Sequence, residues 1–268
     1  MRNVYKNTSI ELTQGSIINN CIAGGVPEKE TIWGCVITPR CDIEHHKVNT
    51  IHYLPIVDYC TWVNVFARQL LYEEWKTNVQ DSIKACLREM KVNEDVFEVG
   101  YDQVDLCNII EASDLSKKSK KNVMDKIMSY FNQPEDTFKK YIEDNKHKKF
   151  IERLISGDLH PFYLIEDWSK CKNSFKVILL RDIRHIDYTI ASEYKKGFFP
   201  TTFTKETLST NNLKEVDDIY CIEAVIQSPY IEHIMQAFTY NFSRIGTPDL
   251  PKEEVTNILI ELTKNIIV

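Results

Sequence analysis

The hydrophobic period of this chain changes twice, and these changes constrain the fold more than any other feature. Residues 12–60 and 162–226 hold short apolar runs rich in β-branched and aromatic residues, which favour strands. Between them, over 62–156, apolar residues recur at i, i+3, i+4 and i+7, which favours amphipathic helices. The order strands, helices, strands predicts an α+β fold.

Three strands are expected on each side of the helical block. The expected strands are 15–18, 33–38, 49–57, 162–165, 175–180 and 219–226. Neither trio alone makes a convincing core, because a small sheet needs further strands or a covering helix. We therefore predict one small β-barrel built from residues 1–61 and 157–227, with 62–156 as a helical insertion. Two consecutive domains are the alternative.

Two helices are expected in residues 228–268, packing on the barrel. Ser228 suits the N-cap of the first helix, and Pro229 suits its first position. The second helix has Asp249 as its cap and an apolar stripe over 255–266.

Composition excludes several classes of function. The chain has 268 residues, of which 43% are hydrophobic and 27% charged, so it is too apolar for disorder. A net charge of −6 argues against a general nucleic-acid binder. The sequence has neither a Walker-type loop nor a G-x-G-x-x-G, so no motif requires a cofactor.

The cysteines and the N-terminal segment indicate a cytoplasmic protein. The eight cysteines are scattered without a C-x-x-C pair, so we expect reduced thiols, most of them small core residues. The first fifteen residues lack an apolar h-region, so no signal peptide is expected. No apolar run reaches the length of a membrane span, so no membrane contact is expected.

Three short segments between residues 15 and 57 follow a known order of strands. Gly15-Ser16-Ile17-Ile18 is similar to an opening G-D-I-V strand. Cys35-Val36-Ile37-Thr38-Pro39 is similar to a strand that ends in Ser or Thr followed by Pro, and Tyr53-Leu54-Pro55-Ile56 to a strand with P-I. Together they resemble the MazF/PemK toxin family of small SH3-like barrels that cleave RNA. The resemblance implies an SH3-like barrel and a toxin–antitoxin or antiviral defence setting in a bacterium.

The same resemblance implies a catalytic pair that this chain keeps only in part. In that family, an arginine just before the second strand acts with the Ser or Thr at its end. Thr38 matches the Ser or Thr position, whereas Thr31, Ile32 and Trp33 stand where the arginine is expected. Arg40 lies beyond the strand instead. The resemblance therefore supports a barrel more than it supports ribonuclease activity.

The densest chemical cluster follows the expected strand 33–38. An aspartate or histidine there has the chemistry of a general base, a cysteine that of a nucleophile, and an arginine that of a phosphate or oxyanion binder. The candidate catalytic residues are Thr38, Arg40, Cys41, Asp42 and His45. The structural alternative is that Cys41 is buried and that Asp42 caps the turn.

Part of this cluster also has the donors that zinc prefers. Cys41 and His45 are four residues apart, so a helical turn would place them on one face, with His46 beside them. No second ligand cluster is evident, since His52, His160, His185 and His233 stand alone in the sequence. Zinc is therefore a candidate cofactor through Cys41, His45 and His46, and nothing in the sequence requires it.

Two other charged segments invite a functional interpretation. Arg181, Arg184 and His185 follow the expected strand 175–180 and could meet the first cluster across a barrel mouth; an Arg–Asp surface pair is the favoured alternative. The basic blocks Lys117–Lys121 and Lys146–Lys149 could contact nucleic acid, although such runs are usually solvated helix faces.

Two functions follow from these features. The first is an accessory or interaction protein that binds a protein partner or a second copy of itself, because no complete catalytic set or cofactor motif is present. The second is a diverged ribonuclease, or another enzyme that cleaves phosphodiesters, using the cluster from Thr38 to His46.

Overall fold

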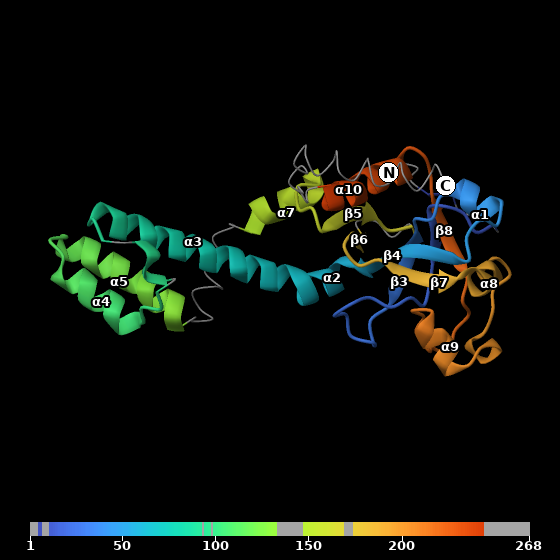
Figure 1. Cartoon of the computed structure of the whole chain (residues 1–268), viewed down its shortest axis with the longest axis horizontal. Coiled ribbons are helices and arrows are strands. Elements are labelled where there is room, and N and C mark those ends of the chain that lie inside the picture. Colours follow the sequence, from blue (N-terminus) through green and yellow to red (C-terminus); the bar gives the residue numbers. More distant parts are fainter. Residues whose placement is uncertain are drawn as a thin grey trace, which may run out of the picture.

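The computed structural model describes residues 5–6, 11–92, 94–97, 99–132, 147–168 and 174–243. Within these residues, a curled sheet with covering helices forms one end of the molecule, and a helical arm extends from it (Figure 1). The predicted mixture of helices and strands is confirmed. The predicted second C-terminal helix, over residues 249–266, lies outside the described residues.

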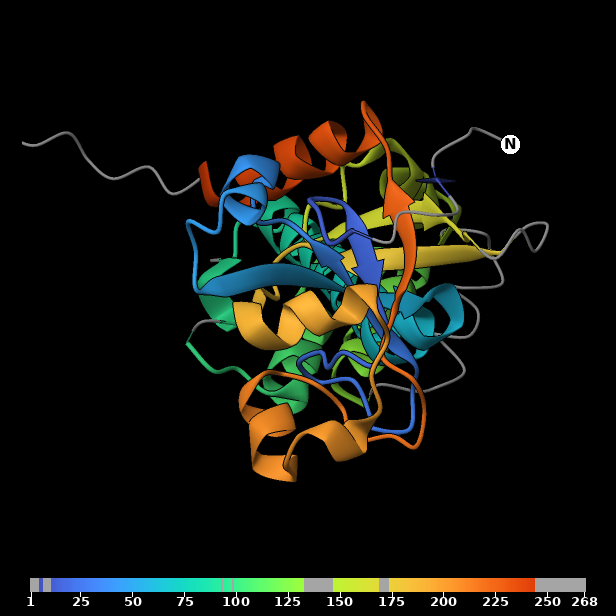
Figure 2. The ribbon, with the colours of Figure 1, turned by 90° about the vertical axis from the view of Figure 1, so that its right-hand side faces the viewer.

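The sheet is antiparallel and curls into a half-barrel (Figure 2). Its strands are β1 (Tyr5–Lys6), β2 (Ser16–Ile18), β3 (Ile32–Val36), β4 (Thr50–Asp58), β5 (Phe162–Glu166), β6 (Phe175–Leu179), β7 (Arg184–Asp187) and β8 (Ile222–Ile226). Their order is β1-β8-β2-β3-β4-β6-β5, with β7 also paired to β4. Strands from before and after the helical block therefore hydrogen-bond within one sheet.

Strand β4 is the longest strand and the centre of this arrangement. It pairs with β3 along one edge. On the other edge its first half pairs with β7 and its second half with β6. Strands β6 and β7 therefore lie one after the other along the same edge of β4.

The two faces of the sheet are covered by different cores. Side chains alternate along a strand, so Tyr53 and Val57 enter the first core while Leu54 and Ile56 enter a second. Helix α10 (Tyr230–Ser243) packs on that second core through Ile231 and is seen above the sheet in Figure 2. The predicted helix is present, but it begins at Tyr230, so Pro229 precedes the helix and does not occupy its first position.

The helical arm begins where β4 ends. Its elements are α2 (Tyr59–Trp62), the π-helix η1 (Val63–Ala67), α3 (Arg68–Glu89), η2 (Glu94–Phe97), α4 (Gln103–Ala112), α5 (Lys117–Asn132) and α7 (His147–Ser156). Helix α3 has 22 residues, which gives it a length of about 33 Å. Its far half packs with α4 and α5 around a separate arm core that includes Ile83, Leu106 and Ile127.

Short helical elements lie between strands of the sheet. They are α1 (Arg40–Glu44), α8 (Tyr188–Ala191), η3 (Ser192–Lys195), η4 (Pro200–Thr202) and α9 (Lys205–Thr210). Strand β7 was not expected, because residues 184–187 include a single apolar residue. This segment is a strand because it pairs with β4. Among the described helices, none combines the length and apolar character needed to span a membrane.

The described cysteines are buried, half-buried or exposed. Cys21 and Cys35 are fully buried, as expected, and burial raises the pKa of the Cys35 thiol to about 12 and that of Cys21 well above its usual value. Both thiols are therefore neutral core groups. Of the seven described cysteines, Cys41 and Cys60 are exposed and Cys86, Cys107 and Cys221 are half-buried, so the expectation that most cysteines are core residues is wrong.

Candidate functional site

The first candidate cluster lies where β3 ends. Pro39 cannot donate to a ladder and precedes helix α1 directly. Thr38 is buried, and its hydroxyl accepts a hydrogen bond from the backbone nitrogen of His52 at 2.7 Å. The predicted catalytic hydroxyl of Thr38 thus holds β4 beside the end of β3.

The remaining candidates lie on helix α1 at the surface. Arg40, Cys41 and His45 are exposed, and Asp42 is half-buried. The predicted helical turn is present, since the His45 nitrogen donates to the Cys41 carbonyl at 3.2 Å. The structural alternative for Cys41 was burial, which is wrong because the thiol is exposed, 3.5 Å from Asp42 Oδ1. Asp42 forms no capping hydrogen bond, because Pro39 is the N-cap and α1 has no side-chain cap.

His46 has a different backbone conformation from the other residues of this cluster. Its φ of 50° places it in the left-handed region. Its ring meets the Tyr188 ring edge-on, with centroids 5.1 Å apart, so α1 is tied to the start of α8. Among the side chains that the structure describes, no group of three or more His, Cys, Asp or Glu is arranged to hold a metal ion. Zinc at Cys41, His45 and His46 stays a prediction.

The second candidate cluster is divided between two places. Arg184 Nε pairs with Asp182 Oδ1 at 2.6 Å, which confirms the Arg–Asp pair, and Asp182 also accepts from the Gly24 nitrogen at 2.6 Å. Arg181 Nε donates instead to Asn241 Oδ1 on α10, at 3.1 Å. The two arginines therefore bind Asp182 and Asn241 and do not contribute to a site with the residues of α1.

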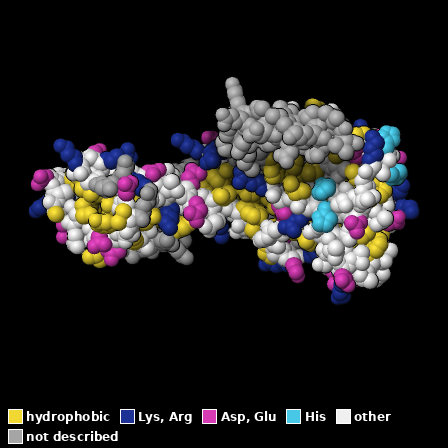
Figure 3. Space-filling model, viewed as in Figure 1, with side chains coloured by type: hydrophobic (Ala, Val, Ile, Leu, Met, Phe, Trp, Pro, Cys, Tyr) yellow, Lys and Arg dark blue, Asp and Glu magenta, His cyan; other side chains and the backbone are white. Residues whose placement is uncertain are grey.

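A histidine pair that sequence reasoning missed lies on β4 and β7. His52 stands directly opposite His185 in the register of these strands, and both side chains are exposed. Figure 3 shows histidine side chains (cyan) exposed over this end of the molecule. The sequence held no signal for this contact, since only the register of β7 on β4 brings the two residues together.

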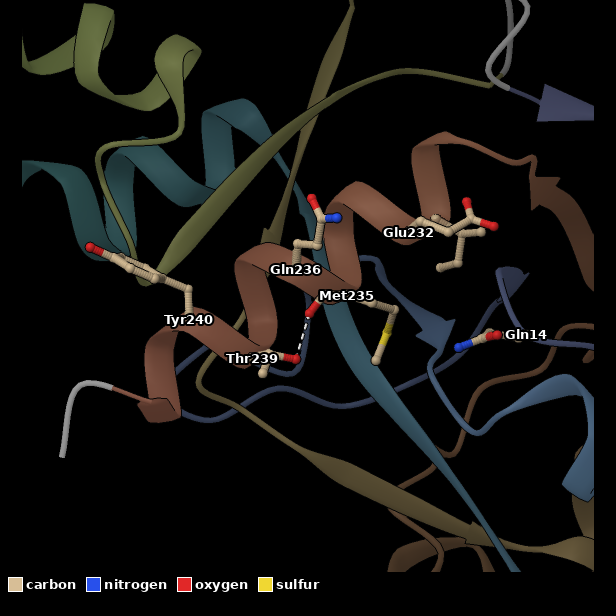
Figure 4. Close-up of a pocket in the computed structure, with 7 residues that line it drawn as sticks. Gln14, Glu232, Met235, Gln236, Thr239 and Tyr240 are labelled. Carbon is tan, nitrogen blue, oxygen red and sulfur yellow. Dashed lines mark hydrogen bonds between the residues drawn. The ribbon is translucent and has the colours of Figure 1, made fainter. Parts of the chain in front are cut away.

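A hollow of about 570 Å³ runs along helix α10 (Figure 4). It is lined by Gln14, Ile231, Glu232, Met235, Gln236, Thr239 and Tyr240. Thr239 donates its hydroxyl to the Met235 carbonyl at 2.8 Å, so this hydroxyl is engaged within the helix. None of the candidate catalytic residues lines this hollow, and they do not converge on it.

The basic blocks lie on different helices. Lys117, Lys118 and Lys121 are exposed on α5 in the arm, whereas Lys120 Nζ donates to the Glu111 carbonyl at 2.7 Å. Lys148 and Lys149 are exposed at the start of α7, and Lys146 lies outside the described residues. The two blocks therefore do not form one continuous basic surface.

Comparisons of the chain with protein-family models, with curated proteins and with solved structures find no match.

Proposed function

We propose that this chain is a bacterial accessory protein that acts by binding a protein partner, and that its helical arm carries the binding surface. The observation that carries this proposal is the arm itself, which has its own core and yet exposes large apolar side chains. The site geometry supports the same choice, because Arg40, Asp42 and His45 do not meet Arg181 or His185 in a pocket.

The exposed apolar side chains of the arm lie close together in sequence. Val99, Tyr101 and Val104 are 70%, 40% and 63% exposed, between η2 and the first turn of α4. We call these three residues the arm patch. Apolar and aromatic residues at an exposed surface mark protein-binding sites when they lie together.

Acidic residues accompany the arm patch and indicate the charge of the partner. Asp95, Asp102 and Asp105 are exposed along the same segment. Asp102 and Asp105 form a capping box at the start of α4, so this segment is held in place. We therefore propose a protein partner that presents apolar side chains bordered by Lys and Arg, since complementary charge guides association.

We expect the triple variant Val99→Ser, Tyr101→Ser, Val104→Ser to lose its partner. The partner is captured from host cells by photo-crosslinking and then purified. Its Kd for the triple variant should rise at least about tenfold, because central apolar residues dominate interface energy. Raising the salt concentration should weaken binding to the unaltered chain, because salt screens the acidic border.

The matched control is Ile155→Ser, which replaces an equally exposed apolar residue (67%) on α7. The Kd of the partner for Ile155→Ser should equal its Kd for the unaltered chain. Equal partner binding by the triple variant and the unaltered chain, with both folded by circular dichroism, would contradict the proposal.

For the architecture, we propose a split SH3-like barrel made of residues 1–61 and 157–227, with 62–156 as its helical insertion. The pairing of β4 with both β3 and β6 supports this proposal, since these strands come from both sides of the helical block. The resemblance to MazF/PemK toxins then favours a toxin–antitoxin or antiviral defence setting in the cytoplasm. An acidic chain without a complete catalytic set suits the accessory role in such a system.

The second candidate is cleavage of phosphodiesters at the α1 turn. One observation favours it: Cys41 and His45 are exposed on a single helical turn, with Asp42 beside the thiol. In this case purified protein cleaves single-stranded or structured RNA, and Asp42→Ala or His45→Ala lowers the rate about 100-fold or more. Reactions with and without Mg²⁺ or Zn²⁺ measure this directly. Absence of cleavage under all these conditions would remove the candidate.

A further inference from the structure

The pairing of β4 with β7 brings two imidazoles to the same point of the surface. The Tyr188 nitrogen donates to the Asn49 carbonyl at 2.8 Å, which makes residues 49 and 188 a hydrogen-bonded pair. The register then makes His52 and His185 a non-hydrogen-bonded pair. In such pairs the Cβ atoms are about 4.5–5.5 Å apart and the side chains leave the sheet on the same face.

The backbone of both histidines is held from the sides that face away from the pair. The His52 nitrogen donates to Thr38 Oγ1 at 2.7 Å, and its carbonyl accepts from the Ile37 nitrogen at 2.9 Å. The His185 carbonyl accepts from Asn212 Nδ2 at 2.9 Å. The two imidazoles therefore project from fixed positions, which lowers the entropy cost of bringing them onto one ligand.

The side chains around the pair leave the ring nitrogens accessible. Asn212 Nδ2 lies 3.5 Å from His185 Nδ1, at the long limit of a hydrogen bond, so this contact is weak. Asp187, two residues after His185 on the same strand, is exposed. Among the described side chains, no third His, Cys, Asp or Glu is arranged with the two imidazoles to hold a metal ion.

We propose that His52 and His185 form a binding site for a late first-row divalent metal ion, such as Zn²⁺, Ni²⁺ or Cu²⁺. Imidazole nitrogens bind these ions at about 2.0–2.1 Å and suit them better than Mg²⁺ or Ca²⁺, which prefer oxygen. Two protein nitrogens leave the site open, with water in the remaining positions. Both histidines belong to the sheet and not to the arm.

A metal ion at this point joins the two halves of the sheet region. His52 belongs to β4, before the helical block, and His185 belongs to β7, after it. Binding therefore stabilises the pairing of β7 with β4 in addition to occupying the two side chains. Since metal binds the folded register and the unfolded chain lacks it, the melting temperature rises with metal concentration.

The test uses the full chain without a histidine tag. Zn²⁺, Ni²⁺ and, as a negative control, Mg²⁺ are titrated by calorimetry, and bound metal is counted after dialysis. We expect about one equivalent of Zn²⁺ or Ni²⁺. His52→Ala and His185→Ala should each raise Kd at least about tenfold. His233→Ala, which removes an exposed histidine on α10, should leave Kd unchanged.

A second readout needs no variant. Ni²⁺ should broaden the imidazole proton signals of two histidines in the unaltered protein, and Zn²⁺ should raise its melting temperature. Unchanged Zn²⁺ and Ni²⁺ binding in both single variants overturns the proposal, as does the absence of saturable binding below about 1 mM. Loss of binding in His45→Ala or His46→Ala alone also overturns it, and assigns the metal to the α1 turn instead.

Discussion

Replacing Lys176 with methionine should lower the free energy of unfolding by about 3 kcal/mol or more, since removing one partner of a buried ion pair strands the other. Lys176 is 4% exposed, with its Nζ 2.7 Å from Asp58 Oδ1 and 3.7 Å from Asp167 Oδ2. The same Nζ lies 3.7 Å from the centroid of the Trp33 ring and 4.9 Å from that of Trp168. Urea unfolding followed by circular dichroism measures the loss.

Two aspartate variants show which carboxylate loses its partner charge when Lys176 is replaced. The Asp167 side chain is 8% exposed and that of Asp58 is 45% exposed. Adding Asp167→Asn to Lys176→Met should therefore recover part of the lost stability, because the buried uncompensated carboxylate is gone. Adding Asp58→Asn should recover less, since water already screens that carboxylate. A Lys176→Met protein as stable as the unaltered chain would show that the lysine contributes nothing.

Replacing Trp62 with alanine should lower the free energy of unfolding by about 3–5 kcal/mol, the usual cost of truncating a buried large aromatic residue. Trp62 is fully buried at the base of the arm. Its ring stacks on Phe150 of α7 with centroids 5.9 Å apart and meets Phe162 of β5 edge-on at 5.4 Å. Loss of the indole therefore leaves a cavity between three elements. Chemical unfolding measures the change.

Two comparisons make this result specific. Phe199→Ala, at a ring that is 58% exposed, should change stability by less than about 0.5 kcal/mol. In hydrogen exchange of Trp62→Ala, the amides of α7 should lose protection, because Phe150 loses its stacking partner. The amides of α4 and α5 should keep theirs, since these helices pack around the separate arm core. Equal loss of amide protection in α5 and α7 would contradict the expectation that Trp62 stabilises the base of the arm locally.

The strands and helices that sequence reasoning found are those whose own residues determine them. The run around Cys35 and the run around Leu54 are apolar enough to require burial wherever they pair. The helical stripe through Ile83 and Leu87 likewise predicted a buried face. What the stripe did not predict is that this face packs within the arm, because periodicity shows that a face is buried and does not show against what.

The features that were missed depend on contacts between distant segments. Strand β7 has weak strand character, and the His52–His185 pair exists only through its register on β4. Lys176 was read as part of an apolar strand, whereas its partners come from three other segments. At the strand-end cluster, sequence reasoning found the turn that aligns Cys41 with His45 but not the role of Thr38, whose hydroxyl is used by the backbone of β4.

The junction between strand β4 and the arm has a mechanical consequence. Asp58 ends the strand and Tyr59 begins helix α2, with no loop residue between them. The arm is thus a stiff lever continuous with the central strand, and its angle is set by the sheet and not by a flexible connection. A load applied at the tip of this lever reaches the five-residue π-turn of η1 first. Beyond it are two points where side chains hold β4: Lys176 at Asp58, and the Thr38 hydroxyl at the backbone of His52.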